Sequence, residues 1–139
     1  MLIQLTYASR SSSMLGPGDI KDILRSSAKN NGALGVTGTL CLSNGIFLQQ
    51  LEGDRDAVNL LYHRILLDKR HKEPAVLDFS EIVSRRFSTW SMGLLAYTQE
   101  NKQLFLKYST AAEFDPYRMS PSSLRAFFDE VVQNVRWLS

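Results

Sequence analysis

The sequence predicts an α+β fold in which strands and helices alternate in the order β-α-β-β-α-β, followed by one further strand and C-terminal helices. Segments in which every second residue is apolar alternate with segments whose apolar residues recur at helical spacing. An Asn-Gly pair, which favours a tight hairpin turn, separates two of the strand-like segments. The length of 139 residues, with 44% hydrophobic residues, suits one well-buried core and an appendage.

The first strand is predicted at residues 2–9, LIQLTYAS, where Ile3, Leu5 and Tyr7 share one face. The first helix is predicted from Asp19 onwards. Its inward stripe changes from apolar to polar along the helix and consists of Ile20, Ile23, Leu24, Ser27, Ala28 and Asn31. The end of this helix therefore presents polar side chains to the sheet.

Residues 36–42 and 46–52 are predicted as the two strands of a hairpin that the Asn-Gly pair closes. The second of these strands contains Gln49 and Gln50 in an otherwise apolar run. A buried carboxamide without a hydrogen-bond partner costs about 1–3 kcal/mol. We therefore expect one of these two amides to have a specific partner.

Asp54 is the predicted N-cap of a second helix, which ends near residues 68–74, DKRHKEP. Arg64, Asp68 and His71 follow one another at i, i+4 and i+7 and form a polar ridge on this helix. The ridge lies beside an apolar stripe that consists of Val58, Leu61, Tyr62, Ile65 and Leu66.

Two more strands are predicted around residues 76–83 and 90–96, with SRRFST at 84–89 as the turn between them. The complete order is that of a ferredoxin-like sandwich with an additional strand.

A polar linker, TQENKQ, separates this core from a tail, so we expect one domain at residues 1–97 and a helical extension at residues 98–139. Ser120 and Pro121 are a typical helix start. The apolar stripe of that helix is Leu124, Phe127, Phe128, Val131 and Val135. It either covers the bare face of the sheet or binds another chain, and the local sequence leaves both open.

Composition excludes several classes of protein. The formal net charge is only +2 and the sixteen Lys and Arg residues are scattered, which argues against a nucleic-acid partner. The single cysteine, Cys41, rules out an internal disulfide and a cysteine-rich zinc site and suits a reducing cytoplasm. No metal site is expected. No membrane association is expected either, because no stretch approaches about 18 apolar residues.

Polar side chains converge if the sheet faces the two helices. A hydroxyl, carboxamides, a cation and an imidazole then surround Ile23 and Ile65, which suits a flat, polar-edged ring with an anionic tail. Each residue taken alone also has a plainer interpretation. Tyr7 is explained as a packed ring, Asn31 as the end of a helix, and the ridge on the second helix as a solvated face.

Five motifs in order, LTYAS, KNNGALGVTGTL, GIFLQQLEG, YHRILLDKRH and RRFSTWSMG, resemble the BLUF family of flavin-binding blue-light sensors. The resemblance runs from residue 2 to about residue 93. The tail, LFLKYSTAAEFDPYRMSP, is similar to that of short stand-alone members of the PixD type, which have no output domain and act by binding a partner.

The resemblance implies a non-covalent flavin, expected to be FAD, with FMN and riboflavin as alternatives. Ile23 and Ile65 would grip the ring, and the Asn31 amide would reach its pyrimidine edge with Asn30 as a secondary neighbour. The residues implied near the ribityl-phosphate end are Arg64, Asp68 and His71.

The resemblance also implies photoactive roles. Tyr7 would donate an electron and a proton, and Gln49, between Tyr7 and the flavin, would be the switch that produces a reversible red-shifted state. Ser27 would lie near this network, and Trp90 and Met92 would sense the switch. The implied partners are a second copy of the chain and an unidentified signalling protein, and no residue is expected to be catalytic.

Three other classes compete with this interpretation. A flavin-dependent oxidoreductase would be expected to show a dinucleotide fingerprint such as GxGxxG, which the sequence lacks. A LOV-type photoreceptor needs a reactive cysteine, whereas Cys41 lacks that motif's surroundings and is expected to be packed. A ferredoxin-like interaction module without flavin photochemistry is the remaining alternative, and the colour of the purified protein would separate it from a photoreceptor.

Overall fold

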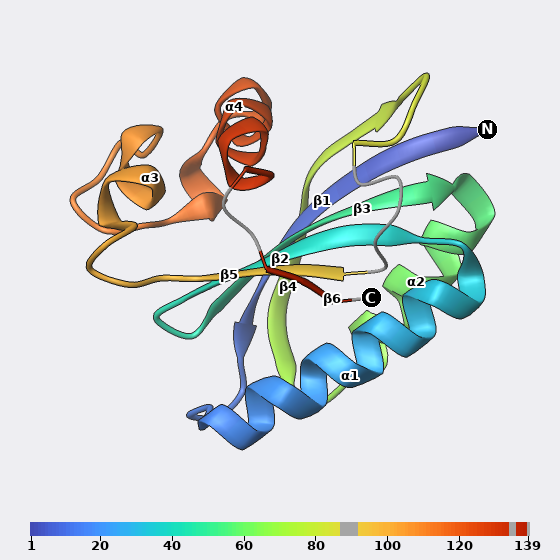
Figure 1. Cartoon of the computed structure of the whole chain (residues 1–139), viewed down its shortest axis with the longest axis horizontal. Helices are drawn as coiled ribbons and strands as arrows, with labels where there is room; N and C mark the ends of the chain where they lie inside the picture. The colour runs from blue at the N-terminus through green and yellow to red at the C-terminus, as the bar shows by residue number, and fades with distance from the viewer. Residues whose placement is uncertain (87–91, 134–135, 139) are drawn as a thin grey trace.

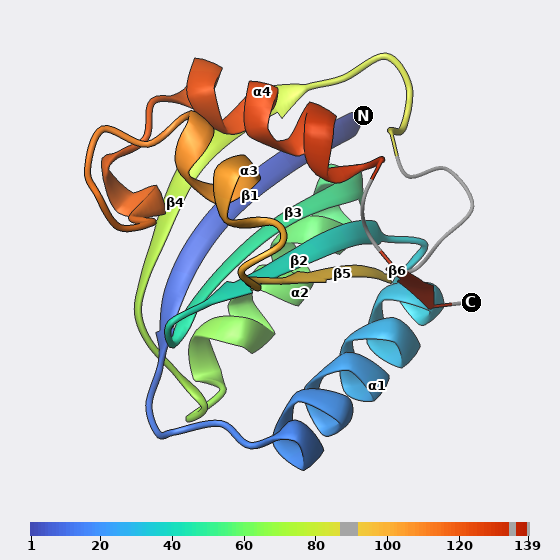
Figure 2. The ribbon, with the colours of Figure 1, turned by 60° about the vertical axis from the view of Figure 1, so that its left-hand side comes forward.

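The computed structural model describes residues 1–86, 92–133 and 136–138. A six-stranded sheet with the order β4-β1-β3-β2-β5-β6 forms the centre of the molecule. Helices α1 and α2 lie on one face of this sheet and α3 and α4 on the other (Figures 1 and 2). The elements are β1 Leu2–Ser11, α1 Pro17–Leu34, β2 Thr37–Ser43, β3 Ile46–Asp54, α2 Arg55–Leu67, β4 His71–Glu81, β5 Met92–Ala96, α3 Lys102–Lys107, a 3-10 turn Pro116–Arg118, α4 Pro121–Val131 and β6 Arg136–Leu138.

The predicted ferredoxin-like sandwich is confirmed. Strands β4, β1, β3 and β2 pair antiparallel in that order, and β5 adds to β2 in parallel as the additional strand. Strand β6 then pairs antiparallel with β5. The tail was predicted to contain only helices, so β6 was not predicted.

Local turn and capping chemistry fixes the predicted hairpin and the second helix. Asn44 and Gly45 both have positive φ, 50° and 76°, as a tight hairpin turn between right-twisted strands requires. The Asp54 side chain accepts a hydrogen bond from the Asp56 backbone N–H, which caps α2 at the predicted residue. The first helix starts at Pro17, before the predicted Asp19, because the Asp19 carboxylate accepts from the Gly16 N–H and caps the helix earlier.

The two faces of the sheet bury different residues. On the face of α1 and α2, Ile3, Leu5 and Leu51 pack against α2, and Leu40 and Phe47 pack against α1. On the other face, which we call the cap face, side chains of the sheet and tail form one core: Ala8, Cys41, Leu48, Leu95, Phe105, Phe114, Leu124, Phe127, Phe128 and Val131. The tail therefore covers the bare face of the sheet, while Val135 of its predicted stripe lies outside the described residues.

Four details of the predicted elements are wrong. Helix α2 ends at Leu67, next to the predicted end near residues 68–74, but His71 opens strand β4 instead of continuing a helical ridge. The reason is a turn in which Asp68 accepts hydrogen bonds from the backbone and guanidinium of Arg70. Leu66, predicted in the buried stripe, is exposed.

The predicted strand at 76–83 instead spans His71–Glu81. Strands β4 and β5, which were predicted to be joined by a turn at residues 84–89, are not neighbours, because three strands of the sheet separate them. Residues 87–89 of that segment lie outside the described residues. Within the described residues no helix is long and apolar enough to cross a bilayer.

Candidate functional site

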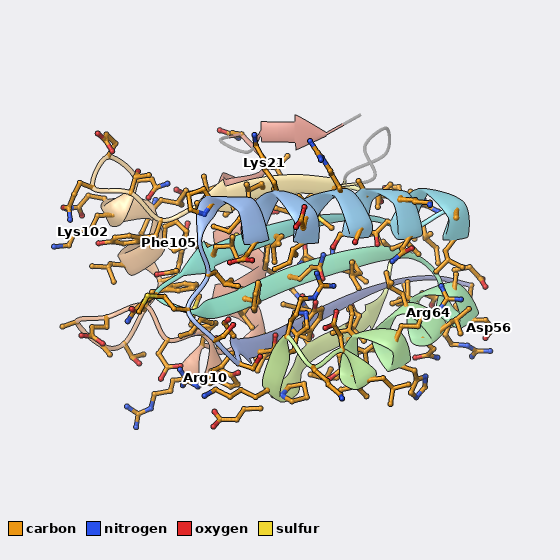
Figure 3. The ribbon with its side chains drawn as sticks, turned by 90° about the horizontal axis from the view of Figure 1, so that it is seen from below. Arg10, Lys21, Asp56, Arg64, Lys102 and Phe105 are labelled. Carbon is orange, nitrogen blue, oxygen red and sulfur yellow. The ribbon has the colours of Figure 1, made fainter. Side chains whose placement is uncertain are left out.

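A cavity opens on the face of the sheet that α1 and α2 cover, and Figure 3 shows this side with Arg64 on α2. It holds about 570 Å³ of space free of protein atoms, a volume that includes space open to solvent. Of the predicted site residues that the structure describes, all but Met92 line it. The lining residues are Tyr7, Ile23, Ser26, Ser27, Asn30, Asn31, Leu40, Phe47, Gln49, Leu61, Arg64, Ile65, Asp68, Arg70 and His71.

Tyr7 and Gln49 form the floor of the cavity. They are directly opposite each other on β1 and β3, and the Tyr7 hydroxyl donates a short hydrogen bond to Gln49 Oε1. The side chains are 1% and 4% exposed, so little water reaches this bond. Burial, with smaller contributions from Tyr62 and Asp68, raises the pKa of Tyr7 far above its ordinary value. Tyr7 is therefore a neutral phenol that donates its proton to an amide.

The other end of the Gln49 amide has a partner too. Its Nε2 donates to Met92 Sδ at 3.6 Å, and Met92 is fully buried at the start of β5. Met92 lies outside the cavity lining and contacts the site through Gln49, in an apolar cluster that includes Ile23 and Phe47. Trp90 lies outside the described residues.

Helix α1 contributes the polar wall. Asn31 is buried, whereas Asn30 is exposed and Ser27 is half-buried. The backbone carbonyl of Asn31 accepts from the Val36 N–H at 2.8 Å, so this residue also closes the helix, as the plainer interpretation suggested. Asn31 lines the cavity as well, so its role at the helix end is compatible with the predicted ring contact, which stays a prediction.

Charged residues gather where α2 ends. Asp68 accepts from Arg70 Nη2 at 2.6 Å, and this hydrogen bond from Arg70 is the main reason that the pKa of Asp68 is lowered. His71 Nδ1 lies 2.8 Å from Ser9 Oγ, and its ring packs 4.7 Å from that of Phe47. Burial lowers the pKa of His71, while Asp68 opposes this shift and Arg70 adds to it.

Sequence reasoning missed several lining residues. Arg70 was missed because only the turn formed with Asp68 brings it to the cavity; its position two residues after that carboxylate was the available signal. Leu61 was identified only as part of an apolar helix stripe, Leu40 and Phe47 only as positions within predicted strands, and Ser26 was not singled out.

The residues of the cavity fit a flavin. Ile23 and Ile65 offer aliphatic side chains from the two helices, and Gln49 and Asn31 offer amide donors and acceptors suited to a ring edge. Arg64 and Arg70 provide guanidinium groups that match a phosphate. Among the described residues no group of His, Cys, Asp and Glu is arranged to hold a metal ion.

Comparison with known proteins agrees with the conclusion that the cavity residues fit a flavin. The model of the family BLUF, "Sensors of blue-light using FAD", matches residues 2–93. Photoactivated adenylate cyclase subunit beta of Euglena longa is 35% identical over 92 residues, which are 66% of this chain and 11% of that protein. The chain thus spans about a tenth of the length of such curated relatives.

Solved structures extend the similarity to the tail. The photo-activated state of BlsA superposes with a TM-score of 0.87 at 26% identity and covers 100% of this chain and 99% of BlsA. Klebsiella pneumoniae BlrP1 with FMN and cyclic diGMP gives a TM-score of 0.67 at 28% identity, over 96% of this chain and 35% of BlrP1. The family match, the fold and the cavity agree, and the chain belongs to the BLUF family of blue-light sensors that use flavin.

Proposed function

We propose that this chain is a non-enzymatic BLUF photoreceptor that binds FAD without a covalent bond and responds to blue light with a reversible red-shifted state. The observation that carries the proposal is the buried chain of Tyr7, Gln49 and Met92 at the floor of the cavity. These three side chains include one proton donor and one amide, of which one end accepts and the other donates hydrogen bonds.

The proposed binding residues follow from their places around the cavity. Ile23 and Ile65 hold the faces of the ring, Asn31 binds its edge, and Asn30 assists from an exposed position. The ribityl-phosphate end is assigned to Arg64, Asp68 and His71, to which the structure leads us to add Arg70. FAD is favoured by the description of the family, and FMN is the alternative because BlrP1 contains it.

When bound, the flavin supplies blue-light absorption and a strongly oxidising excited state. Tyr7 is the proposed donor of an electron and a proton, since burial keeps its hydroxyl protonated and directed at Gln49 Oε1. Once the electron and the proton have returned to Tyr7, Gln49 would be left either rotated, with its donor and acceptor ends exchanged, or tautomerised, with one proton moved from Nε2 to Oε1. Rotation would turn Nε2 away from Met92 Sδ, and tautomerisation would leave Nε2 with a single N–H, so either change alters the contact that Met92 makes with Gln49. We therefore assign Met92 and Trp90 the role of sensing the switch, and Ser27 a place beside the network.

The proposed output is a protein contact. We expect a homo-oligomer and a downstream signalling protein in a reducing cytoplasm, where the buried free thiol of Cys41 would persist. Support comes from relatives in which a region similar to this chain makes up about a tenth of a larger photoactivated cyclase.

An absorption spectrum of the purified protein before and after blue light tests the proposal. We expect a yellow protein whose flavin band moves reversibly to longer wavelength, and release of the cofactor by denaturation followed by chromatography distinguishes FAD from FMN. A colourless protein would favour the ferredoxin-like interaction module instead. A flavin-bound sample whose band stays in place would refute the photosensor assignment.

A further inference from the structure

The two neighbouring glutamines of β3 serve opposite faces of the sheet. Gln49 faces the cavity, and Gln50 is fully buried on the cap face. Gln50 Nε2 donates to Thr6 Oγ1 at 3.2 Å, and Gln50 Oε1 accepts from Arg86 Nη1 at 3.1 Å. Both ends of this amide are therefore occupied, which explains how the core tolerates it.

Arg86 extends this contact to the tail. Its Nη2 lies 2.7 Å from Asp129 Oδ1 on α4, the helix that crosses the cap face (Figure 2). Its backbone N–H donates to the buried carboxylate of Glu52 at 2.7 Å, which fixes the start of the side chain. One guanidinium thus joins β3 to α4 through the Gln50–Arg86–Asp129 chain.

The series of contacts from Gln50 through Arg86 to Asp129 begins beside Gln49, the proposed switch. Tyr7 pairs with Gln49, and Thr6 pairs with Gln50, as consecutive cross-strand pairs of β1 and β3. The hydrogen bond of the first pair lies on the cavity face and that of the second on the cap face. Because a packed interior has little free space, a rearrangement of Gln49 that displaces its backbone also changes the Thr6–Gln50 contact.

The contact between Arg86 and Asp129, at the far end of this series, is easily altered. The Asp129 side chain is 63% exposed and that of Arg86 is 25% exposed. A partly exposed ion pair contributes little stability, so a small change at Gln50 is enough to break the contact of Arg86 with Asp129, while the buried aromatic residues keep α4 on the sheet.

We propose that the Gln50–Arg86–Asp129 chain transmits the rearrangement of Gln49 through the sheet and loosens the attachment of α4 in the light. Gln50 and Arg86 are positioning residues in this scheme and do not contact the flavin. The inference rests on the proposed function, since it assumes that light rearranges Gln49.

A second ion pair supplies a matched control. Arg125 lies one turn before Asp129 on α4 and binds Asp78 of β4 through two hydrogen bonds, of 2.8 and 3.0 Å. This pair also attaches α4 to the sheet, but it reaches β4 instead of β3. Its removal weakens the same helix without breaking the connection to Gln50.

The test is hydrogen exchange, read by mass spectrometry, of the flavin-bound full chain in darkness and under continuous blue light. In the wild-type protein, peptides from α4 should exchange faster in the light. Asp129→Ala should keep the red shift of the flavin band and lose this light–dark difference, and Asp129→Glu, which retains a carboxylate, should restore it. Arg125→Ala should speed exchange of α4 in both states and keep the difference.

Gln50→Leu should reproduce the Asp129→Ala result from the other end of the chain. Because Gln50 is buried and its variant risks misfolding, the exposed Asp129 variants decide the question. Three results would overturn the proposal: a wild-type red shift without a change at α4, a full light–dark difference in Asp129→Ala, or an equal loss in Arg125→Ala. A wild-type protein without a red shift would refute the proposed function itself.

Discussion

Tyr7 and Gln49 face each other across two antiparallel strands, and the phenol donates its proton to an amide whose other end is held by a thioether. Only a side chain with both a donor and an acceptor can occupy the middle of this arrangement. The asymmetry of the carboxamide is what allows one site to have two hydrogen-bonding patterns.

Removing either end of the Tyr7–Gln49 bond should abolish photoconversion but keep the cofactor. Tyr7→Phe lacks the hydroxyl that supplies the proton, and Gln49→Leu lacks the group that changes its bonding. We expect both variants to purify yellow and to show no red shift in light-minus-dark spectra. Tyr62→Phe is the control, because its ring lies 5.3 Å from that of Tyr7 outside the hydrogen-bonded chain. Wild-type photoconversion in Tyr7→Phe would contradict the assignment.

Asn31→Ala should weaken flavin retention. Each lost hydrogen bond contributes about 0.5–1.5 kcal/mol net, which corresponds to roughly a two- to tenfold higher Kd. Titration of the apoprotein with flavin, followed by fluorescence quenching, measures the change. Asn30→Ala, at the exposed neighbouring position, should have a smaller effect. Equal effects of the two substitutions would contradict the assignment of the ring contact to Asn31.

His71 should make stability depend on pH below neutrality. Burial lowers its pKa in the folded state, so the unfolded chain binds the proton more readily. Its contribution to stability is complete above the ordinary histidine pKa of about 6.5 and is lost as the pH falls from there through the folded-state value. Urea unfolding of the wild type and His71→Gln between pH 5 and 8 (roughly the histidine window) measures this. The same pH dependence in His71→Gln as in the wild type would contradict this prediction.

The cap face should be essential for folding. Phe127 is fully buried between α4 and the sheet, and Phe127→Ala should lower the free energy of unfolding by about 3–5 kcal/mol. Leu67→Ala, at an exposed position, should have little effect in the same denaturant titration. If Phe127→Ala were as stable as the wild type, the tail would be a loosely attached extension.

Sequence reasoning succeeded where neighbouring residues decide the structure. Asn44 and Gly45 define their turn by backbone conformation, and Asp54 caps its helix through a side chain two residues from the N–H it binds. Cavity residues such as Ile23 and Asn31 were identified because helical spacing and family resemblance agree on one face.

The failures depend on contacts distant in sequence or on side-chain geometry. No local pattern indicates that residues 136–138 pair with β5, or that Arg86 binds both Gln50 and Asp129. His71 was wrongly placed on the ridge of α2, because a side-chain turn at Asp68 ends the helix although the i, i+4, i+7 pattern continues to His71.

Cys41, the single cysteine of the sequence, lies in the core between the sheet and the tail with no exposed surface. Burial also raises the pKa of its thiol, so the folded protein should resist thiol reagents. Labelling must therefore wait until the tail lifts from the sheet, and its rate reports the free energy of that opening. The Cys41 thiol is thus a built-in kinetic probe of how often the tail leaves the cap face, and its labelling rate can be measured in darkness and in light without an added cysteine.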